Sequence, residues 1–361
     1  MRLAAIASAL AIVLCVAVFG AIFLQRSSDF TSLASAPAPT APTEGRAPGA
    51  VVRAVDNPVA SPAAAAMAEA PRAVAQAPAQ APLPTAMPTS CSNPNALGVA
   101  RVVEIDTTGG PGFGFEHFKS HDFLREGEVV LTFDDGPWPK NTPAVLAALN
   151  AHCTKAIFFP IGTHATYEPS ILKQVAAAGH AVGSHTWCHQ DLSKTKGKCL
   201  INGKVQAVEY DPKDEIEKGI SAVRWAVGGP TAPYFRFPAL RQPQELIDYL
   251  GKRNIAIFST DFDSFDFKMR KPEQVRQAVM AKLKKHGKGI ALMHDFQHAT
   301  AEAAMDLLND LKAGGYKVVF MKPKSPVTTI ASYDEEVLKL TKGPGTSDSR
   351  PTSSVVRTIA E

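Results

Sequence analysis

Residues 34–90 contain no phenylalanine, tryptophan or tyrosine and few large aliphatic side chains. Alanine and proline dominate the segment instead. Such a composition cannot bury enough apolar surface to offset the entropy that is lost when a chain becomes ordered. We therefore predict that residues 27–90 form a disordered, semi-extended linker outside the folded part of this 361-residue chain.

The chain also lacks a run of lysine and arginine interleaved with aromatic residues, and its formal net charge is only +4. Nucleic-acid binding usually requires a concentrated basic surface. The basic stretch at residues 282–288 is typical of a solvated helix end. We therefore expect no nucleic-acid partner.

Charged residues are absent from residues 3–24, a run of 22 residues that is long enough to span a bilayer. A cleaved signal has a shorter apolar region, with a small-x-small site close behind it. The best such site here, Ala34 to Ala36, lies well downstream. We favour a membrane anchor over a cleaved signal peptide for residues 1–26. Either one implies export, and we expect a periplasmic or cell-envelope protein held to the inner membrane by residues 3–24.

Only five cysteines are present, and Cys15 lies in the apolar run. The other four allow three pairings in an oxidising compartment, and the sequence does not choose among them. We expect Cys153 to be a buried thiol before a strand. The pairing of Cys188 with Cys199, which flank one loop, is favoured over the others.

The folded part is expected over residues 91–325, the size of one domain, followed by a largely disordered tail at 326–361. Short apolar runs predict strands at 129–133, 156–161, 181–184, 234–237, 256–259, 289–293 and 317–321. Helical spacing predicts helices at 142–151, 169–178, 214–227, 244–252, 272–285 and 301–313. This alternation indicates an α/β fold with parallel strands and crossover helices.

Seven strands suit either an open doubly wound sheet or a barrel. Polar residues at the carboxyl ends of the strands favour the barrel, because those ends share one mouth there. These residues are Asp134, His185, Arg236, Asp263 and His294. Asn202-Gly203, between two short β-prone runs, predicts a hairpin inserted beside the site.

Asp134 and Asp135 stand in the motif Leu-Thr-Phe-Asp-Asp-Gly-Pro at residues 131–137. Adjacent acids on a strand point in opposite directions, so both face one mouth only if a turn redirects one of them. The functional interpretation assigns one carboxylate to a metal and the other to proton transfer. The alternative is a turn or a helix cap.

His185 and His189 are four residues apart, a spacing that can place both imidazoles on one metal ion. Two histidines and one aspartate leave coordination positions open for water, and they suit Zn²⁺ best, with Co²⁺, Ni²⁺ or Mn²⁺ as alternatives. Cys188 as a ligand is a weaker hypothesis. His294 with His298 makes a competing pair at the same spacing.

Three further residues suit supporting roles. His294, at a strand end, is a candidate general acid. Arg236 can hold a carboxylate, or it can form an ordinary surface ion pair. Asp263 and Asp266 offer acids that could orient a histidine, although they could also be ordinary loop acids.

These motifs occur in the order Thr-Phe-Asp-Asp-Gly-Pro, His-Thr-x-x-His, Arg-Phe-Pro, Asp-Ser-Phe-Asp-Phe and Leu-Met-His. The set resembles the polysaccharide deacetylases (the chitooligosaccharide-deacetylase, or NodB, homology domain; carbohydrate esterase family 4) over about residues 127–321. The resemblance implies a distorted, TIM-barrel-like (β/α)7 barrel. It also implies a metal-dependent hydrolase that removes N-acetyl groups from N-acetylglucosamine-type units of a glycan, and we expect that hydrolase to be a monomer.

The resemblance further implies residue roles. Asp134 is the general base held by Arg236, and Asp135 joins the two histidines on the metal. His294 is the general acid, oriented by Asp266. The implied substrate-binding residues are Pro238, Ala239, Phe267 and Leu292. Ala239 stands where the family usually has tyrosine, and Phe267 where it usually has tryptophan, and both differences bear on the choice of substrate more than on the chemistry. An O-acetyl esterase, another metal-dependent amidase and a non-catalytic glycan-binding module remain as alternatives.

Overall fold

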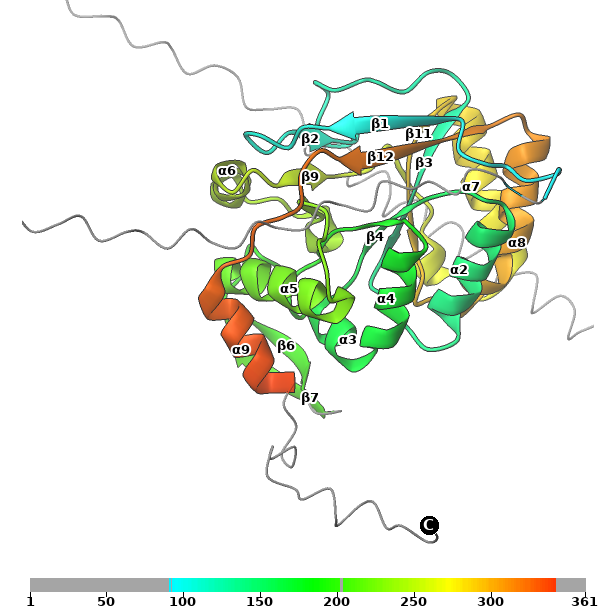
Figure 1. Cartoon of the computed structure of the whole chain (residues 1–361). Coiled ribbons are helices and arrows are strands. Elements are labelled where there is room, and N and C mark those ends of the chain that lie inside the picture. The colour runs from blue at the N-terminus through cyan, green and yellow to red at the C-terminus, as the bar shows by residue number, and fades with distance from the viewer. Residues whose placement is uncertain (1–90, 92, 202–203, 342–361) are drawn as a thin grey trace, which may run out of the picture. The chain divides into compact units, whose positions relative to one another are not determined.

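The computed structural model describes residues 91, 93–201 and 204–341 (Figure 1). Within this part of the chain, parallel strands form two sheets, and helices pack around them. A separate two-stranded antiparallel hairpin completes the set of sheets. The predicted α/β class with parallel strands is therefore confirmed.

The larger sheet is built around β3 (Glu128–Asp134), all seven residues of which are buried. Val129, Leu131 and Phe133 pack against the helical layer, whereas Val130 faces the opposite side of the sheet. A strand that is buried on both faces explains the near-continuous apolar run in the sequence. The other strands of this sheet are β1 (Arg101–Ile105), β4 (Ile157–Phe159), β5 (Ala181–Val182), β10 (Phe262–Asp263), β11 (Gly289–His294) and β12 (Lys317–Pro323).

The smaller sheet contains β2 (Gly112–Phe113), β8 (Tyr234–Phe235) and β9 (Ala256–Phe258), again in parallel. A single parallel bridge between Ser184 and Phe235 connects its edge to the chain just after β5. Among the described residues the strand ladders remain two sheets and do not form one continuous closed ring.

Helices follow most strands, as the alternation predicted. They are α2 (Asn141–Ala151), α3 (Gly162–Tyr167), α4 (Pro169–Ala177), α5 (Pro212–Val227), α6 (Gln244–Lys252), α7 (Pro272–His286), α8 (His298–Ala313) and α9 (Ala331–Thr341), with short 3₁₀ turns at Pro238–Leu240 and Asp266–Lys268. In Figure 1, α2, α7 and α8 lie side by side on one flank. Leu149 of α2 and Leu307 of α8 are buried in the same core cluster as β3.

The predicted hairpin is present as β6 (Lys196–Ile201) and β7 (Lys204–Glu209), which pair antiparallel. Its proposed turn residues, Asn202 and Gly203, lie outside the described residues. A disulfide joins Cys199 of β6 to Cys188, as favoured from the sequence. The hairpin is therefore bonded covalently to the loop that carries His185 and His189.

One prediction was wrong, and another is corrected in part. Cys153 is not a free thiol but forms a disulfide with Cys91, which is 62 residues away along the chain. The segment expected to be a largely disordered tail from residue 326 contains a helix, because α9 lies against α5 and buries Val337 (Figure 1). Helical spacing within Ala331–Thr341 carried this signal. The rest of that segment, from residue 342, lies outside the described residues.

No helix in residues 91, 93–201 and 204–341 is long and apolar enough to cross a membrane. The predicted anchor at 3–24 and the predicted linker at 27–90 fall outside the residues that the structure describes.

Candidate active site

The polar residues predicted from the motifs gather where β3 and β11 end. Because these two strands are parallel and pair His294 with Asp134, their carboxyl ends bring both residues to one edge. Ion pairs and hydrogen bonds connect the set, which comprises Asp134, Asp135, His185, His189, Arg236, Asp266 and His294. The expected common location of these side chains is thus observed.

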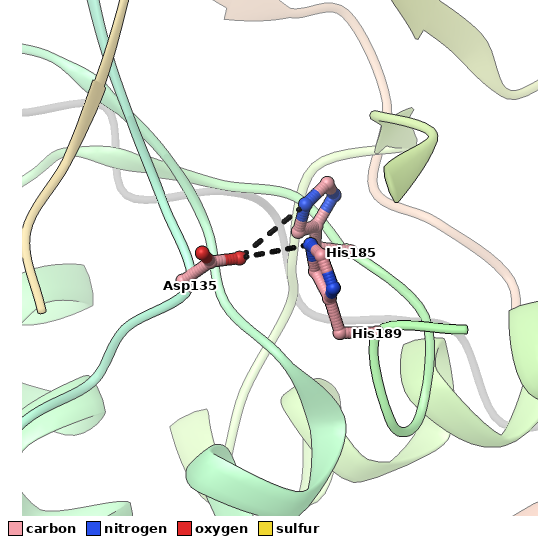
Figure 2. Close-up of side chains that lie close together, drawn as sticks. All are labelled: Asp135, His185 and His189. Atoms are coloured by element: carbon pink, nitrogen blue, oxygen red, sulfur yellow. Dashed lines mark ion pairs between the residues drawn. The ribbon is translucent and has the colours of Figure 1, made fainter. Parts of the chain in front are cut away.

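Asp135 points toward the two histidine rings, as Figure 2 shows. Its Oδ1 lies 3.4 Å from Nε2 of His185 and 3.4 Å from Nε2 of His189. One ligand atom from each residue lies within 4.8 Å of the others. The competing pair is not assembled, because His298 is 75% exposed and contacts Glu302 instead.

The three side chains fit a divalent metal in chemistry as well as in spacing. Asp135 Oδ1 is buried and has no hydrogen-bond partner among the described residues. His185 Nδ1 lies 2.7 Å from the carbonyl oxygen of Arg236, which can only accept, so Nδ1 carries the proton and Nε2 presents a lone pair to Asp135. Burial lowers the pKa of His185 to about 4, which favours the neutral, metal-binding imidazole.

Backbone conformation explains how both adjacent acids face the same space. Asp134 ends β3, and Asp135 takes a left-handed conformation with φ of 71°. This turn interrupts the alternation of a strand. As a result, Oδ2 of Asp134 and Oδ1 of Asp135 lie 3.9 Å and 3.4 Å from the same nitrogen of His185.

Arg236 is fully buried and directs its guanidinium at Asp134. Nη1 donates to Oδ1 of Asp134 and to Oγ1 of Thr132, both at 2.7 Å. The guanidinium also stacks on the ring of Phe159, 4.5 Å from its centroid. This geometry excludes the alternative of a surface ion pair, and burial is deeper than the flanking aromatic residues suggested.

His294 is held by Asp266 at two points. Nδ1 of His294 donates to Oδ1 of Asp266 at 2.7 Å, and the His294 backbone N–H donates to Oδ2 at 2.8 Å. Burial lowers the pKa of His294, but the hydrogen bond and negative charge of Asp266, with Asp135 and Asp134, outweigh burial and raise it to about 9. These contacts favour the protonated ring, whose Nε2 lies 4.0 Å from Oδ2 of Asp135.

The predicted substrate-binding residues lie around this centre in different environments. Phe267 is 43% exposed and meets the His294 ring edge to face, with centroids 5.4 Å apart. Leu292 is buried and, two residues before His294 on β11, projects from the same face of the strand. Pro238 is buried, whereas Ala239 is exposed with a left-handed φ of 51°.

Sequence reasoning missed a group of aromatic side chains beside the site, Trp138, His164 and Phe296, which we call the aromatic rim. Trp138 is 41% exposed and contacts His164 and Phe296, with ring centroids 5.3 Å and 6.4 Å away. Phe296 in turn contacts His294 at 5.9 Å. His164 also donates from Nδ1 to the carbonyl oxygen of Asp135 at 2.7 Å. An exposed tryptophan directly after the Gly-Pro turn was the available signal.

Asp295 was also missed. It is almost fully buried next to His294 in sequence, and Oγ1 of Thr142 donates to its Oδ2 at 2.5 Å. Burial raises the pKa of Asp295 to about 7. The Asp295 carboxylate can lie against residue 136 only because that residue is glycine. A Cβ at Gly136 would lie 2.2 Å from Oδ2 of Asp295.

Comparison with known proteins identifies the family of the chain. The profile of the polysaccharide deacetylase family matches residues 123–257, which include Asp134, Asp135, His185, His189 and Arg236. A chitooligosaccharide deacetylase of Bradyrhizobium is 30% identical over 167 residues, covering 46% of this chain and 70% of that protein. A peptidoglycan-N-acetylglucosamine deacetylase of Listeria monocytogenes is 31% identical over 193 residues, or 53% of this chain.

The chain spans only 37% of the length of that Listeria protein. Among solved structures, a peptidoglycan deacetylase of Bdellovibrio bacteriovorus aligns with a TM-score of 0.53 and 30% identity, covering 63% of this chain and 59% of its own. Sequence, fold and site geometry agree, and the chain belongs to the polysaccharide deacetylase family.

Proposed function

We propose that this protein is a metal-dependent hydrolase that removes N-acetyl groups from N-acetylglucosamine-type units of a polysaccharide. The observation that carries the proposal is the cluster of Asp135, His185 and His189 between an Asp134–Arg236 pair and a His294–Asp266 pair. The names of similar proteins, a chitooligosaccharide deacetylase and a peptidoglycan-N-acetylglucosamine deacetylase, support this substrate class.

Asp135, His185 and His189 would hold the metal, with Zn²⁺ as the best match to two neutral imidazoles and one carboxylate. Co²⁺, Ni²⁺ and Mn²⁺ suit the same donors less specifically. When bound, such an ion lowers the pKa of a water and polarises the substrate carbonyl. His189 is 41% exposed, so the ligand cluster is accessible from solvent on that side.

Asp134 is the general base in this proposal. Arg236 occupies its Oδ1 and fixes the carboxylate, while Oδ2 faces His185 on the metal side. The base is therefore oriented before substrate arrives, so it does not have to reorganise during the reaction. It would take the proton of the water that attacks the acetamide carbonyl.

His294 is the general acid that protonates the leaving amine. Its Nδ1 is committed to Asp266, so the Nε2 proton is the one available for transfer. Ala239, exposed in the turn after Arg236, is proposed to supply its backbone N–H to the oxyanion. Phe267 and Leu292 would line the acetyl pocket.

The two parallel sheets are proposed to be the parts of one distorted (β/α)7 barrel. The Ser184–Phe235 bridge links the sheets on one side, and the short chain between β9 and β10 links them on the other. In such a barrel the ends of β3, β8, β10 and β11 would share one mouth. The deacetylase domain in this view extends from residue 91 to the end of α9.

We further propose that the domain acts outside the cytoplasm, in the periplasm or cell envelope. Two disulfides support an oxidising compartment. The apolar run at residues 3–24 supports attachment to a membrane. Treatment of whole cells with a protease, followed by analysis of the membrane fraction, would test which side of the membrane carries the domain.

Acetate release from a panel of N-acetylated and O-acetylated glycans, with and without chelator, tests the activity. We expect release from the N-acetylated glycans that chelator abolishes and Zn²⁺ restores. Release from the O-acetylated glycans alone would assign an esterase instead. Binding without any release would assign a non-catalytic module.

A further inference from the structure

The loop that carries both histidines has an unusual backbone. Thr186 and His189 are both left-handed, with φ of 67° and 54°. Side chains other than glycine reach this region only at a cost of about 1 kcal/mol or more each, so surrounding contacts must hold them there. The ligand geometry of His189 therefore depends on groups outside the loop.

One such group is Glu215, in the first turn of α5. Its carboxylate is buried, and Oε2 accepts a hydrogen bond of 2.9 Å from the backbone N–H of Cys188, the residue before His189. Its backbone carbonyl accepts from the N–H of Trp187 at 2.8 Å. α5 thus holds two successive peptide groups of the loop.

The inserted hairpin holds the same residue from the other side. The Sγ atom of Cys188 is bonded to Cys199 of β6. The amide of Gln190 donates to the carbonyl oxygen of Cys188 at 3.3 Å and to that of Lys198 in β6 at 2.7 Å. The nitrogen, oxygen and sulfur of Cys188 are therefore all engaged, by α5, by Gln190 and by β6.

We infer that the hairpin and α5 are positioning elements of the metal site: Cys199 and Glu215, acting through Cys188, hold His189 in its ligand conformation. This inference rests on the proposed metal-dependent function, and it assigns the hairpin a role distinct from covering the substrate. Groups behind a ligand typically change metal affinity by about 10- to 100-fold when they are removed. The effect should therefore appear in Zn²⁺ binding itself, without any turnover.

The first test replaces the disulfide by two serines, Cys188→Ser with Cys199→Ser, in the full-length chain. Changing both cysteines avoids a free thiol that could bind the metal. We expect the Kd for Zn²⁺, measured by competition with a chromogenic chelator, to rise about 10- to 100-fold. The matched control is Cys91→Ser with Cys153→Ser, which removes the remote disulfide and should change the Kd less than about threefold.

The second test uses Glu215, and it separates positioning from stability. Glu215→Leu removes the acceptor for the Cys188 N–H and should raise the Kd for Zn²⁺ about tenfold. Glu215→Gln keeps an oxygen acceptor and should retain nearly the parental Kd. Glu217→Leu is the matched control, because Glu217 is an equally buried acid of the same helix that contacts Tyr249 and Arg253 instead.

Equal Zn²⁺ affinities in the parent, the active-site double serine variant and Glu215→Leu would overturn the inference. An equal loss in both double serine variants, or in Glu215→Leu and Glu217→Leu, would also overturn it, since the cause would then be general destabilisation. A parental chain that binds no Zn²⁺ would instead refute the proposed function. The two failures are therefore distinguishable.

Discussion

Arg236 Nη1 lies 2.7 Å from Oδ1 of Asp134, and neither side chain is more than 3% exposed. A buried charge pair of this kind stabilises the fold only while both partners are present, because removal of one leaves the other uncompensated. The pair therefore has two separable consequences, one for chemistry and one for stability.

Asp134→Asn keeps the shape of the side chain and removes the base. We expect acetate release to fall by about 100- to 10,000-fold, while the Kd for Zn²⁺ stays within a few-fold of the parent. Steady-state acetate release with calorimetric Zn²⁺ titration checks both. Near-normal turnover in this variant would exclude Asp134 as the base.

Arg236→Leu should affect folding first. It leaves the Asp134 carboxylate buried without its cation and should lower the free energy of unfolding by about 3–5 kcal/mol. Denaturant unfolding of the variant measures this. The double variant Arg236→Leu with Asp134→Leu removes both charges and should recover part of the loss, which distinguishes charge burial from lost packing.

Asp266→Asn should move the pH profile of the enzyme. The general acid must be protonated, so activity falls as pH rises through the pKa of His294, which Asp266 helps to raise. Removing that charge lowers the pKa, and the alkaline limb of kcat/KM should shift to lower pH by at least about one unit. Asp310→Asn, at an acid of α8 that pairs with Arg276 of α7 and not with His294, should leave the alkaline limb in place.

Glu215 gives a prediction about stability and pH. Burial raises the pKa of its carboxyl from 4.5 to about 7, so between these values the folded protein binds more protons than the unfolded chain. Stability should therefore fall as pH rises through this window, by up to about 3 kcal/mol from this residue. Unfolding of the chelated protein should show a shallower decline in Glu215→Gln. If the free energy of unfolding declined equally with pH in the parent and in Glu215→Gln, this contribution of Glu215 would be ruled out.

Trp138→Ala tests the aromatic rim. The exposed indole of Trp138, which contacts His294 only through Phe296, offers a flat apolar face to a sugar ring. We expect KM for a glycan oligomer to rise several-fold, with kcat changed less than about twofold, since Trp138 touches none of the proposed reacting residues. Leu340→Ala, an exposed apolar side chain of α9, should change neither parameter.

The sequence predicted the site better than it predicted the edges of the fold. Asp135, His185 and His189 were identifiable because each belongs to a compact motif, and parallel strands bring such motifs to one edge. The strands β1 and β2 were missed. Alternate side chains of β1 are exposed to solvent, so the strand does not form a continuous apolar run, and β2 contains only two residues.

Other features depend on contacts between distant segments, which no local pattern encodes. Cys91 reaches Cys153 across 62 residues, and four cysteines alone cannot reveal this pairing. Glu215, in the first turn of a helix, looks like an ordinary acid that complements the helix dipole. Only the packing of α5 under the histidine loop shows that its carboxylate binds Cys188.

Left-handed backbone recurs around this centre, at Asp135, Thr186, His189, Ala239 and Phe265. In an active lineage the side chains at the two proposed ligand positions, Asp135 and His189, are required, so selection must retain residues that their backbone conformation disfavours. A descendant that has lost the activity is released from this demand. Glycine or asparagine at the positions equivalent to Asp135 and His189 should then accumulate and raise the melting temperature. Such replacements would mark inactive descendants among otherwise similar sequences.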